Sequence, residues 1–273
     1  MQQHLVNNVA FYTFHSFDRL GGIRHCFSTR IGGVSEGCFH SLNLGFGRGD
    51  DNANVRENYR RLGDAAGFSC EDIVFSDQVH ETRVVPVGAA HRGNGFSKPK
   101  DEALLRVDGL MTHDKHVVLT TFYADCVPLY FYDSIKHVIA LSHAGWKGTL
   151  GEIGRITVEA MAREYGSQPQ DIWAGIGPSI GPESFEVDRP VADAFAHGLP
   201  HSKPFIHAHE NVEGKYFIDL WGINGETLLL AGLLPEHIET AGLCTKQNPG
   251  IFFSHRHSGA ARGSLAAFLA LLP

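Results

Sequence analysis

Two imidazoles and one thiol stand where apolar segments of the sequence give way to small or polar residues. His80 lies in SDQVHE, Cys126 in YADCVP and His143 in LSHAGWKGT. One thiolate and two imidazoles suit zinc, and three protein ligands leave a fourth position for water or substrate, as in catalytic zinc sites. The three residues match no compact metal-binding motif. Their sequence context also allows Cys126 to be an inert buried residue and each histidine to be a hydrogen-bonded rim residue.

A second pair of histidines occurs in FFSHRHSG, where His255 and His257 are two residues apart. On a strand, this spacing places both imidazoles on one face. The segment offers no third ligand, so we expect these residues to lie near the site or on the surface without binding the metal.

Apolar runs that are typical of buried strands flank the three candidate ligands, and strand ends open onto a common rim where distant residues can meet. We expect strands at Ile23–Ser28, Ile73–Val79, Arg83–Val87, Gly109–Thr112, Val117–Tyr123, Val127–Tyr132, Val138–Leu141, Asp171–Ile176, Glu239–Leu243, Ile251–Ser254 and Ser264–Leu271. Helices are predicted over residues 52–66, 149–165, 190–197 and 220–231, the first capped by Asn52 or Asn54 and ended by Gly67. Residues 29–51 are rich in glycine and predict a long functional loop.

The order of these elements indicates the fold class. Strands follow one another directly in some places and are separated by helices in others, which predicts an α+β protein with mixed sheets covered by outer helices. No internal repeat or Pro/Ser-rich linker divides the sequence. We therefore expect one domain over residues 1–273.

Composition narrows the classes of function. The chain has 273 residues, of which 43% are hydrophobic, a net charge of −7, and 23 lysines and arginines that are scattered along the sequence. This distribution argues against nucleic acid as a partner. No run of about 18 apolar residues predicts a membrane span, and the N-terminal segment lacks a signal pattern, so we expect a cytoplasmic protein. Five cysteines without a CxxC pair favour free thiols over a disulfide framework.

Seven segments together give the sequence a family resemblance. They are FSTRIGGVSEGCFHSLNLG, GDDNANVRENYRRL, DQVH, ADCVPL, HAGWKGT, GIGPSIGPESFEV and CTKQNPGIFFSHR. In this order they resemble the YfiH-type laccase-domain family, also described as multicopper polyphenol oxidase or purine nucleoside phosphorylase. The resemblance implies a layered sandwich of two sheets between helices, and a zinc ion bound by His80, Cys126 and His143.

The resemblance also implies the reactions: phosphorolysis of adenosine, inosine and methylthioadenosine, and hydrolytic deamination of adenosine. Zinc lowers the pKa of water toward neutrality, which suits attack on C6 of adenine. Phosphorolysis instead requires a phosphate held beneath the anomeric carbon while cationic groups offset its charge. The expected partners are therefore a purine nucleoside and phosphate.

Candidate substrate residues follow from these demands. In the glycine-rich loop, Arg30 suits bidentate pairing with phosphate, Asn43 offers its amide, and the N–H groups of Gly32 and Gly33 could complete a cradle. Arg48 and Lys147 are alternative cations. Gln78 precedes His80 by two residues and, on a strand, would share its face. Phe46 or Trp146 could stack on a purine, although a core role is favoured for Trp146.

Departures from the family pattern and three rival functions remain open. Ser184 stands where many members have cysteine, and SHRHSGAARG is altered, which puts substrate preference in doubt. The rivals are a copper-dependent polyphenol oxidase, a cysteine hydrolase with Cys126 as nucleophile and His143 as base, and a structural zinc or nucleotide-binding module. The sequence decides neither the preferred substrate and native metal nor the oligomeric state.

Overall fold

The structure is a computed structural model that describes residues 1–272. Its helices are α1 (His15–Leu20), α2 (Asn52–Ala66), α3 (Trp146–Leu150), α4 (Ile153–Tyr165), α5 (Arg189–Gly198), α6 (Leu220–Leu230) and α7 (His255–Ser258). Its strands are β1 (Gln2–Val6), β2 (Val9–Thr13), β3 (Ile23–Ser28), β4 (Ile73–Phe75), β5 (Val84–Pro86), β6 (Gly109–Thr112), β7 (Val118–Tyr123), β8 (Val127–Asp133), β9 (Val138–Ala144), β10 (Ile172–Ile176), β11 (Glu186–Asp188), β12 (Ile206–Ala208), β13 (Lys215–Ile218), β14 (Ile238–Thr240) and β15 (Leu265–Leu271).

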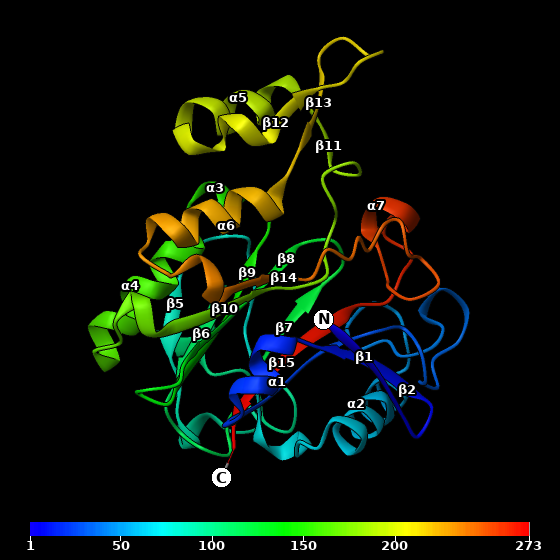
Figure 1. Ribbon diagram of the computed structural model, residues 1–273. Helices are drawn as coiled ribbons and strands as arrows, with labels where there is room; N and C mark the ends of the chain where they lie inside the picture. Colours follow the sequence, from blue (N-terminus) through cyan, green and yellow to red (C-terminus); the bar gives the residue numbers. More distant parts are fainter. Residues whose placement is uncertain (273) are drawn as a thin grey trace.

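Two six-stranded sheets form the centre of the molecule. The first has the order β1-β2-β3-β15-β7-β4 and the second has the order β14-β10-β8-β9-β6-β5. Most neighbours are antiparallel, but β4 pairs with β7, β5 with β6 and β14 with β10 in parallel. A smaller antiparallel sheet, β11-β13-β12, lies with α5 beyond α6 in Figure 1. The predicted mixed α/β architecture is thereby confirmed.

The layers follow from the alternation of side chains along the strands. Along β8, Leu129 and Phe131 face one apolar cluster, and Tyr130 and Tyr132 face another. The first cluster joins the second sheet to α4 and α6, and the second cluster fills the space between the two sheets. A third cluster joins the outer face of the first sheet to α2. The order of layers is therefore α2, first sheet, second sheet, and α4 with α6 (Figure 1).

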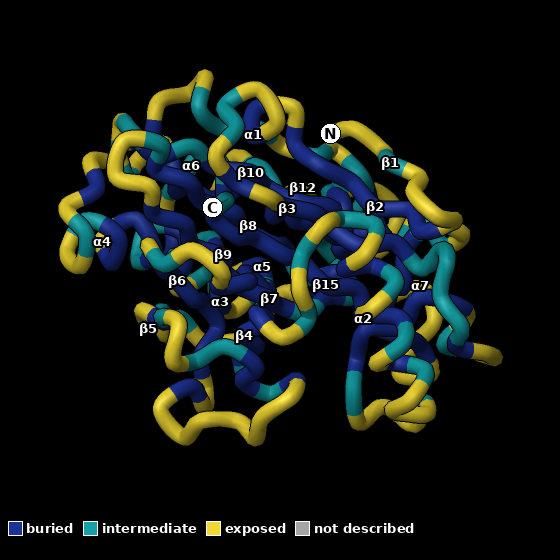
Figure 2. Tube along the Cα trace, turned by 90° about the horizontal axis from the view of Figure 1, so that it is seen from below, coloured by how far each residue is buried: buried dark blue, intermediate teal, exposed yellow. Residues whose placement is uncertain are grey.

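Figure 2 shows the consequence for exposure: the central strands β8 and β15 are dark blue, and the connecting loops are mostly exposed or intermediate. Every residue of β8, β9 and β15 is buried. Apolar surface on both faces of a strand has to be covered, and the two layers on either side of each sheet provide that cover. No helix within residues 1–272 has the length and apolar composition needed to cross a membrane.

Several predicted element boundaries are wrong. The segment Ile251–Ser254 is a turn leading to α7, because the N–H groups of Ile251 and Phe252 both donate to the carbonyl of Asn248. The helix predicted over residues 149–165 is split into α3 and α4 at Glu152, which has a positive φ of 55°. The N-terminal hairpin β1–β2 and helix α1 were not predicted.

The predicted cap of α2 is also wrong by one residue. Asp51 is the N-cap, and its carboxylate accepts a hydrogen bond from the N–H of Ala53 at 2.8 Å. Aspartate and asparagine are equally favourable N-cap residues, so residue type alone does not identify the cap. The extended backbone of Asp51 identifies it as the N-cap. The predicted end is confirmed, since Gly67 adopts the left-handed conformation with a φ of 79°.

Candidate metal centre and substrate cavity

Strand pairing brings two of the three candidate ligands together. In the antiparallel pair of β8 and β9, Val127 lies opposite Ala144 and Pro128 lies opposite His143. Cys126 immediately precedes β8, so it lies beside the end of β9, where His143 is the penultimate residue. His80 reaches the same place from the loop after β4. One donor atom from each of the three residues lies within 4.8 Å of the others.

A fully buried carboxylate holds this arrangement in place. Oδ1 of Asp108 lies 2.8 Å from Nδ1 of His143 and accepts the N–H of His80 at 3.0 Å. Its Oδ2 accepts the N–H groups of Val79 and Glu81 at 3.1 and 2.9 Å. These bonds turn the chain away from β4, and His80 has a φ of 63°. This is why β4 ends at Phe75, four residues before the predicted end.

The hydrogen bond to Asp108 also orients the imidazole of His143. With Nδ1 turned to the carboxylate, Nε2 remains available on the other side of the ring as a ligand or base. The main chain adds a second connection, because the N–H of His143 donates to the carbonyl of Asp108 at 2.7 Å. The ring therefore has a fixed position before any ligand binds.

The electrostatics of the cluster favour an ionised sulfur. Burial alone raises the pKa of Cys126, but the adjoining His143 and His80 outweigh it and lower the pKa to about 6. Burial alone lowers the pKa of His143, but Cys126 and Asp108 outweigh it and raise the pKa to about 9. Thiolate is the form of cysteine that binds metals and acts as a nucleophile. The site thus prepares the sulfur for either role.

The space around the donors fits a bound ion. A Cβ on Gly145 would lie 2.8 Å from Cδ2 of His80, 3.2 Å from the sulfur of Cys126 and 3.6 Å from Cε1 of His143. Only glycine leaves the three side chains free to approach one another here. A soft thiolate, two imidazoles and a carboxylate that orients one of them form a donor set suited to a borderline metal ion such as zinc or copper.

The three donors open onto a cavity of about 340 Å³. One wall is aromatic and another carries cations from the glycine-rich loop and the C-terminal region. The lining residues are Gly45, Phe46, Arg48, Phe75, Ser76, Asp77, Gln78, His80, Gly95, Lys100, Phe122, Tyr123, Ala124, Cys126, His143, Arg262 and Ser264. The volume falls in the lower part of the range for small-molecule sites.

Two of the five predicted substrate residues, Arg48 and Gln78, line this cavity. Gln78 was expected to lie on a strand, but β4 ends before it. Its Nε2 donates to the carbonyl of Phe122 at 2.8 Å, and its Oε1 accepts the N–H of Phe122 at 2.6 Å. The side chain thus replaces a missing strand neighbour beside β7 while it lines the cavity.

Arg30 lies elsewhere. Its guanidinium donates to the carbonyls of His40 and Pro249 at distances from 2.6 to 2.9 Å and lies over the ring of Phe253, 4.6 Å from the centroid. Its guanidinium is thus bound to main-chain carbonyls, and Arg30 is not among the residues that line the cavity. In the sequence Arg30 is a cation in a loop without an evident partner. In the folded protein the carbonyls of His40 and Pro249 are its partners.

Asn43 is fully buried and also stands outside the cavity lining. Its Oδ1 accepts the N–H groups of Gly45 and Ser264, each at 2.9 Å, and its Nδ2 donates to Asp50 at 2.8 Å. Asn43 thereby joins the glycine-rich loop to the start of β15. It supports the cavity wall and does not face a substrate.

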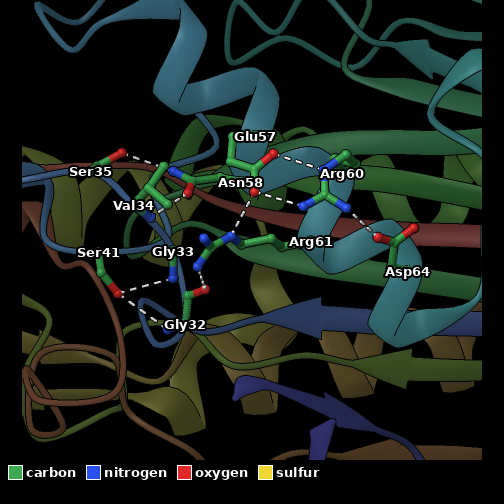
Figure 3. Close-up of polar contacts among 10 residues, drawn as sticks. All are labelled: Gly32, Gly33, Val34, Ser35, Ser41, Glu57, Asn58, Arg60, Arg61 and Asp64. Carbon is green, nitrogen blue, oxygen red and sulfur yellow. Dashed lines mark hydrogen bonds and ion pairs between the residues drawn. The ribbon is translucent and has the colours of Figure 1, made fainter. Parts of the chain in front are cut away.

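The glycine cradle is not formed either (Figure 3). The N–H groups of Gly32 and Gly33 donate to the hydroxyl of Ser41 at 3.2 and 3.1 Å. The next N–H, that of Val34, donates to Oδ1 of Asn58 on α2 at 2.8 Å. These donors are used inside the protein, where they hold the loop against α2.

Of the remaining candidates, only Phe46 lines the cavity. Lys147 is exposed on α3, and its Nζ lies over the ring of Trp146, 5.6 Å from the centroid. Trp146 packs against the core, as favoured from the sequence, and Phe46 lines the cavity. His255 and His257 are exposed on the short helix α7, so the predicted strand at this position is wrong.

Ser184 is buried and lies 3.4 Å from the sulfur of Cys244. It is not among the cavity-lining residues. The departure from the family pattern at Ser184 therefore lies in the packing around Cys244 and not in the wall of the cavity.

Asp108, which orients His143, and three cavity-lining residues, Lys100, Arg262 and Ser264, were not predicted from the sequence. Asp108 directly precedes an expected strand, as Cys126 does, and this position at a strand end could have identified it. Arg262 lies in the altered C-terminal segment SHRHSGAARG, and no sequence motif indicated a function for it. Its place in the cavity depends on the return of the chain through β15, next to β7 and β3.

Comparisons with known proteins agree with this architecture. Residues 24–272 match the family described as multi-copper polyphenol oxidoreductase laccase. A purine nucleoside phosphorylase, YlmD, of Bacillus subtilis is 39% identical over 245 residues, which cover 90% of this chain and 87% of that protein. The crystal structure of Bacillus licheniformis protein YfiH superposes with a TM-score of 0.90 at 34% identity, over 99% of each chain.

The crystal structure of YlmD from Geobacillus stearothermophilus superposes with a TM-score of 0.89 at 35% identity, over 99% of this chain and 98% of that one. The family match and these identities hold over nearly the whole sequence, and the layered sheets agree in three dimensions. The chain therefore belongs to the multi-copper polyphenol oxidoreductase laccase family, and it is similar to YfiH and YlmD proteins along nearly its whole length.

Proposed function

We propose that this protein is a zinc-dependent purine nucleoside phosphorylase that also deaminates adenosine. The single observation that carries the proposal is the meeting of donor atoms from His80, Cys126 and His143 within 4.8 Å of one another in the wall of a cavity of about 340 Å³. The similarity to YlmD of Bacillus subtilis, a purine nucleoside phosphorylase, supports the nucleoside phosphorylase activity.

The cavity suits a purine nucleoside. Phe46, Phe75, Phe122 and Tyr123 give it an aromatic wall, which can pack against the flat face of a purine. Arg48, Lys100 and Arg262 give it cations, which suit phosphate. In phosphorolysis a phosphate oxygen bonds to the anomeric carbon, the bond from that carbon to the purine nitrogen breaks, and the base leaves with a proton.

A zinc ion held by His80, Cys126 and His143 would supply a Lewis acid beside the reacting nucleoside. The chain itself positions the reactants. Asp108 fixes the ring of His143, Gln78 fixes the cavity wall at Phe122, and the aromatic side chains exclude water from one side of the purine. Fixed geometry of this kind lowers the entropic cost of the reaction.

One assay tests the proposal. Zinc-loaded protein is incubated with adenosine, with and without phosphate, and adenine, hypoxanthine, inosine and ribose 1-phosphate are separated. Adenine and ribose 1-phosphate that depend on phosphate indicate phosphorolysis, and inosine formed without phosphate indicates deamination. Inosine and methylthioadenosine are tested as further substrates. If no purine product is formed from any of them, the proposal is wrong.

A cysteine hydrolase is the second candidate, and one observation favours it. Cys126, His143 and Asp108 are arranged as nucleophile, base and orienting carboxylate, and the pKa of Cys126 is lowered to about 6, burial being outweighed by the two histidines. His80 has no role in such a triad, whereas it completes a metal site. A hydrolase stays active after chelation of metals and loses activity on alkylation of Cys126.

Copper-dependent polyphenol oxidation, the reaction in the name of the family, requires a different set of metal ligands. A multicopper centre needs several groups of ligands, and residues 1–272 contain one group of three or more side chains placed to share an ion. Copper binds nitrogen ligands more tightly than zinc does. Metal analysis of freshly isolated protein, together with oxidation of a phenol by the copper-loaded and zinc-loaded forms, separates the two proposals.

A further inference from the structure

Two arginines in the cavity wall have no anionic partner. Within residues 1–272, neither Arg48 nor Arg262 forms an ion pair with an acidic side chain. The other cation in the wall, Lys100, is paired with Asp77, which also lines the cavity. The positive charge of Lys100 is thereby offset, whereas the charges of the two arginines are not.

Arg262 is the more unusual of the two because it is buried. Only 8% of its surface is exposed, and its Nη1 donates to the carbonyl of Gly263 at 2.9 Å. Its Nε is buried and has no hydrogen-bond partner among the described residues. A buried guanidinium with an unused donor loses free energy unless a ligand satisfies it.

The charge of Arg262 persists at neutral pH. Burial and then the neighbouring Arg48 lower its pKa to about 10, and Asp125 and Cys126 act in the opposite direction. Two like charges that interact across one cavity disfavour each other. Their placement is explained if a negative group binds between them.

Ser264 and Gly45 complete the wall. Gly45 brings the two sides together, since a Cβ there would lie 2.6 Å from the hydroxyl oxygen of Ser264 and 3.2 Å from Cδ of Arg48. Ser264 lines the same cavity as both arginines. Two guanidinium groups and one hydroxyl provide several donors of the kind that bind the oxygens of a phosphate.

We propose that Arg262, Arg48 and Ser264 form a subsite for a phosphate group in the cavity of the metal centre. The identification of this group as the attacking phosphate of phosphorolysis rests on the proposed function. The same chemistry would bind the 5′-phosphate of a nucleotide. Arg48 comes from the glycine-rich loop and Arg262 from the segment before β15. The subsite therefore combines residues that are far apart in the sequence.

The test uses full-length protein and inorganic phosphate as the probe. R262Q and R48Q each remove one charge, and R163Q is the control, because Arg163 is exposed on α4 and paired with its neighbour Glu164. Calorimetric titration is expected to give a dissociation constant for phosphate roughly 10- to 100-fold higher in R262Q and in R48Q, from the loss of charge-assisted hydrogen bonds. R163Q is expected to match the original protein.

A parallel titration with adenosine and adenosine 5′-monophosphate identifies the source of the phosphate group. Weaker binding of inorganic phosphate in both cavity variants supports a site for free phosphate. Weaker binding of the nucleotide alone, with adenosine unaffected, supports a site for a phosphate ester. Unchanged affinity for both phosphate compounds in R262Q and R48Q overturns the subsite.

Further measurements distinguish a failure of the subsite from misfolding of a variant and from a failure of the proposed function. Circular dichroism and thermal unfolding verify each variant, and R48Q, whose side chain is exposed, tests the subsite even if R262Q fails to fold. Binding of phosphate through Arg48 without turnover of any nucleoside leaves the subsite intact while the proposed function fails. Phosphorolysis with the same KM for phosphate in R48Q, R262Q and the original protein overturns the subsite alone.

Discussion

The carboxylate of Asp108 lies 2.8 Å from Nδ1 of His143 and is completely buried. It accepts three further hydrogen bonds from the main chain that carries His80. One side chain therefore fixes both imidazoles of the cluster, one through its ring and the other through its backbone. Loss of a partner of this kind typically lowers the metal affinity of a site by about 10- to 100-fold.

The substitution D108N is expected to weaken zinc binding roughly 10- to 100-fold, because the imidazole of His143 loses its charged orienting partner. Competition with a chromophoric chelator measures the affinity. D133N is the matched control: Asp133 is also completely buried and accepts main-chain hydrogen bonds, in the turn after β8. Equal zinc affinities in D108N and the original protein would contradict the role of Asp108.

Gly145 is expected to tolerate no side chain while a metal is bound. In G145A the new Cβ pushes against His80 and Cys126, so the affinity for zinc should fall about tenfold or more, since small displacements of ligands are costly. The backbone of Gly145 has an ordinary φ of −65°, so the effect is steric. G250A is the control, because a Cβ at Gly250 meets nothing within 4 Å. The same chelator titration decides the outcome.

Arg30 is expected to stabilise the fold and to leave phosphate binding unchanged. R30Q removes hydrogen bonds to His40 and Pro249 and the contact with Phe253, which should lower the free energy of unfolding by about 1–3 kcal/mol. Urea unfolding measures this loss. The KM for phosphate is measured alongside, and a rise of tenfold with unchanged stability would restore Arg30 as a substrate residue.

His25 makes stability depend on pH. Its Nε2 accepts the N–H of Phe14 at 2.7 Å, and burial lowers its pKa to about 4 although Asp18 and Glu239 act against it. In the unfolded chain His25 has an ordinary pKa near 6.5. Between about pH 6.5 and pH 4 it is therefore protonated in the unfolded chain but neutral in the folded protein. Stability is therefore complete above about pH 6.5 and falls as the pH drops to about 4, by about 3 kcal/mol.

H25Q serves as the comparison for this dependence, because glutamine offers an acceptor to Phe14 without titrating. Urea unfolding at intervals between pH 7 and pH 4 measures both proteins. The stability of H25Q should fall less over this interval than that of the original protein. Parallel curves would show that another group is responsible.

Local patterns in the sequence were enough to find most of the central strands. Alternating and continuous apolar runs identified β3, β6 to β10 and β15 with small errors at their ends, because buried strands require such runs wherever they lie in the sheet. The same reasoning failed at the N-terminal hairpin β1–β2. There β1 is mostly exposed, so its sequence carries little hydrophobic signal, whereas β2 was missed although all of its residues are buried.

The sequence by itself selected the three donors, through their places at the ends of apolar runs together with the family resemblance of the segments that contain them. Tertiary structure alone decided which polar residues join them. Arg30 and Asn43 looked available in the loop, but long-range contacts with Pro249 and Ser264 occupy them. Arg262 looked unremarkable, yet the pairing of β15 with β7 brings it to the cavity. A side chain's partners are set by chain segments hundreds of residues away, and spacing along one segment carries no record of them.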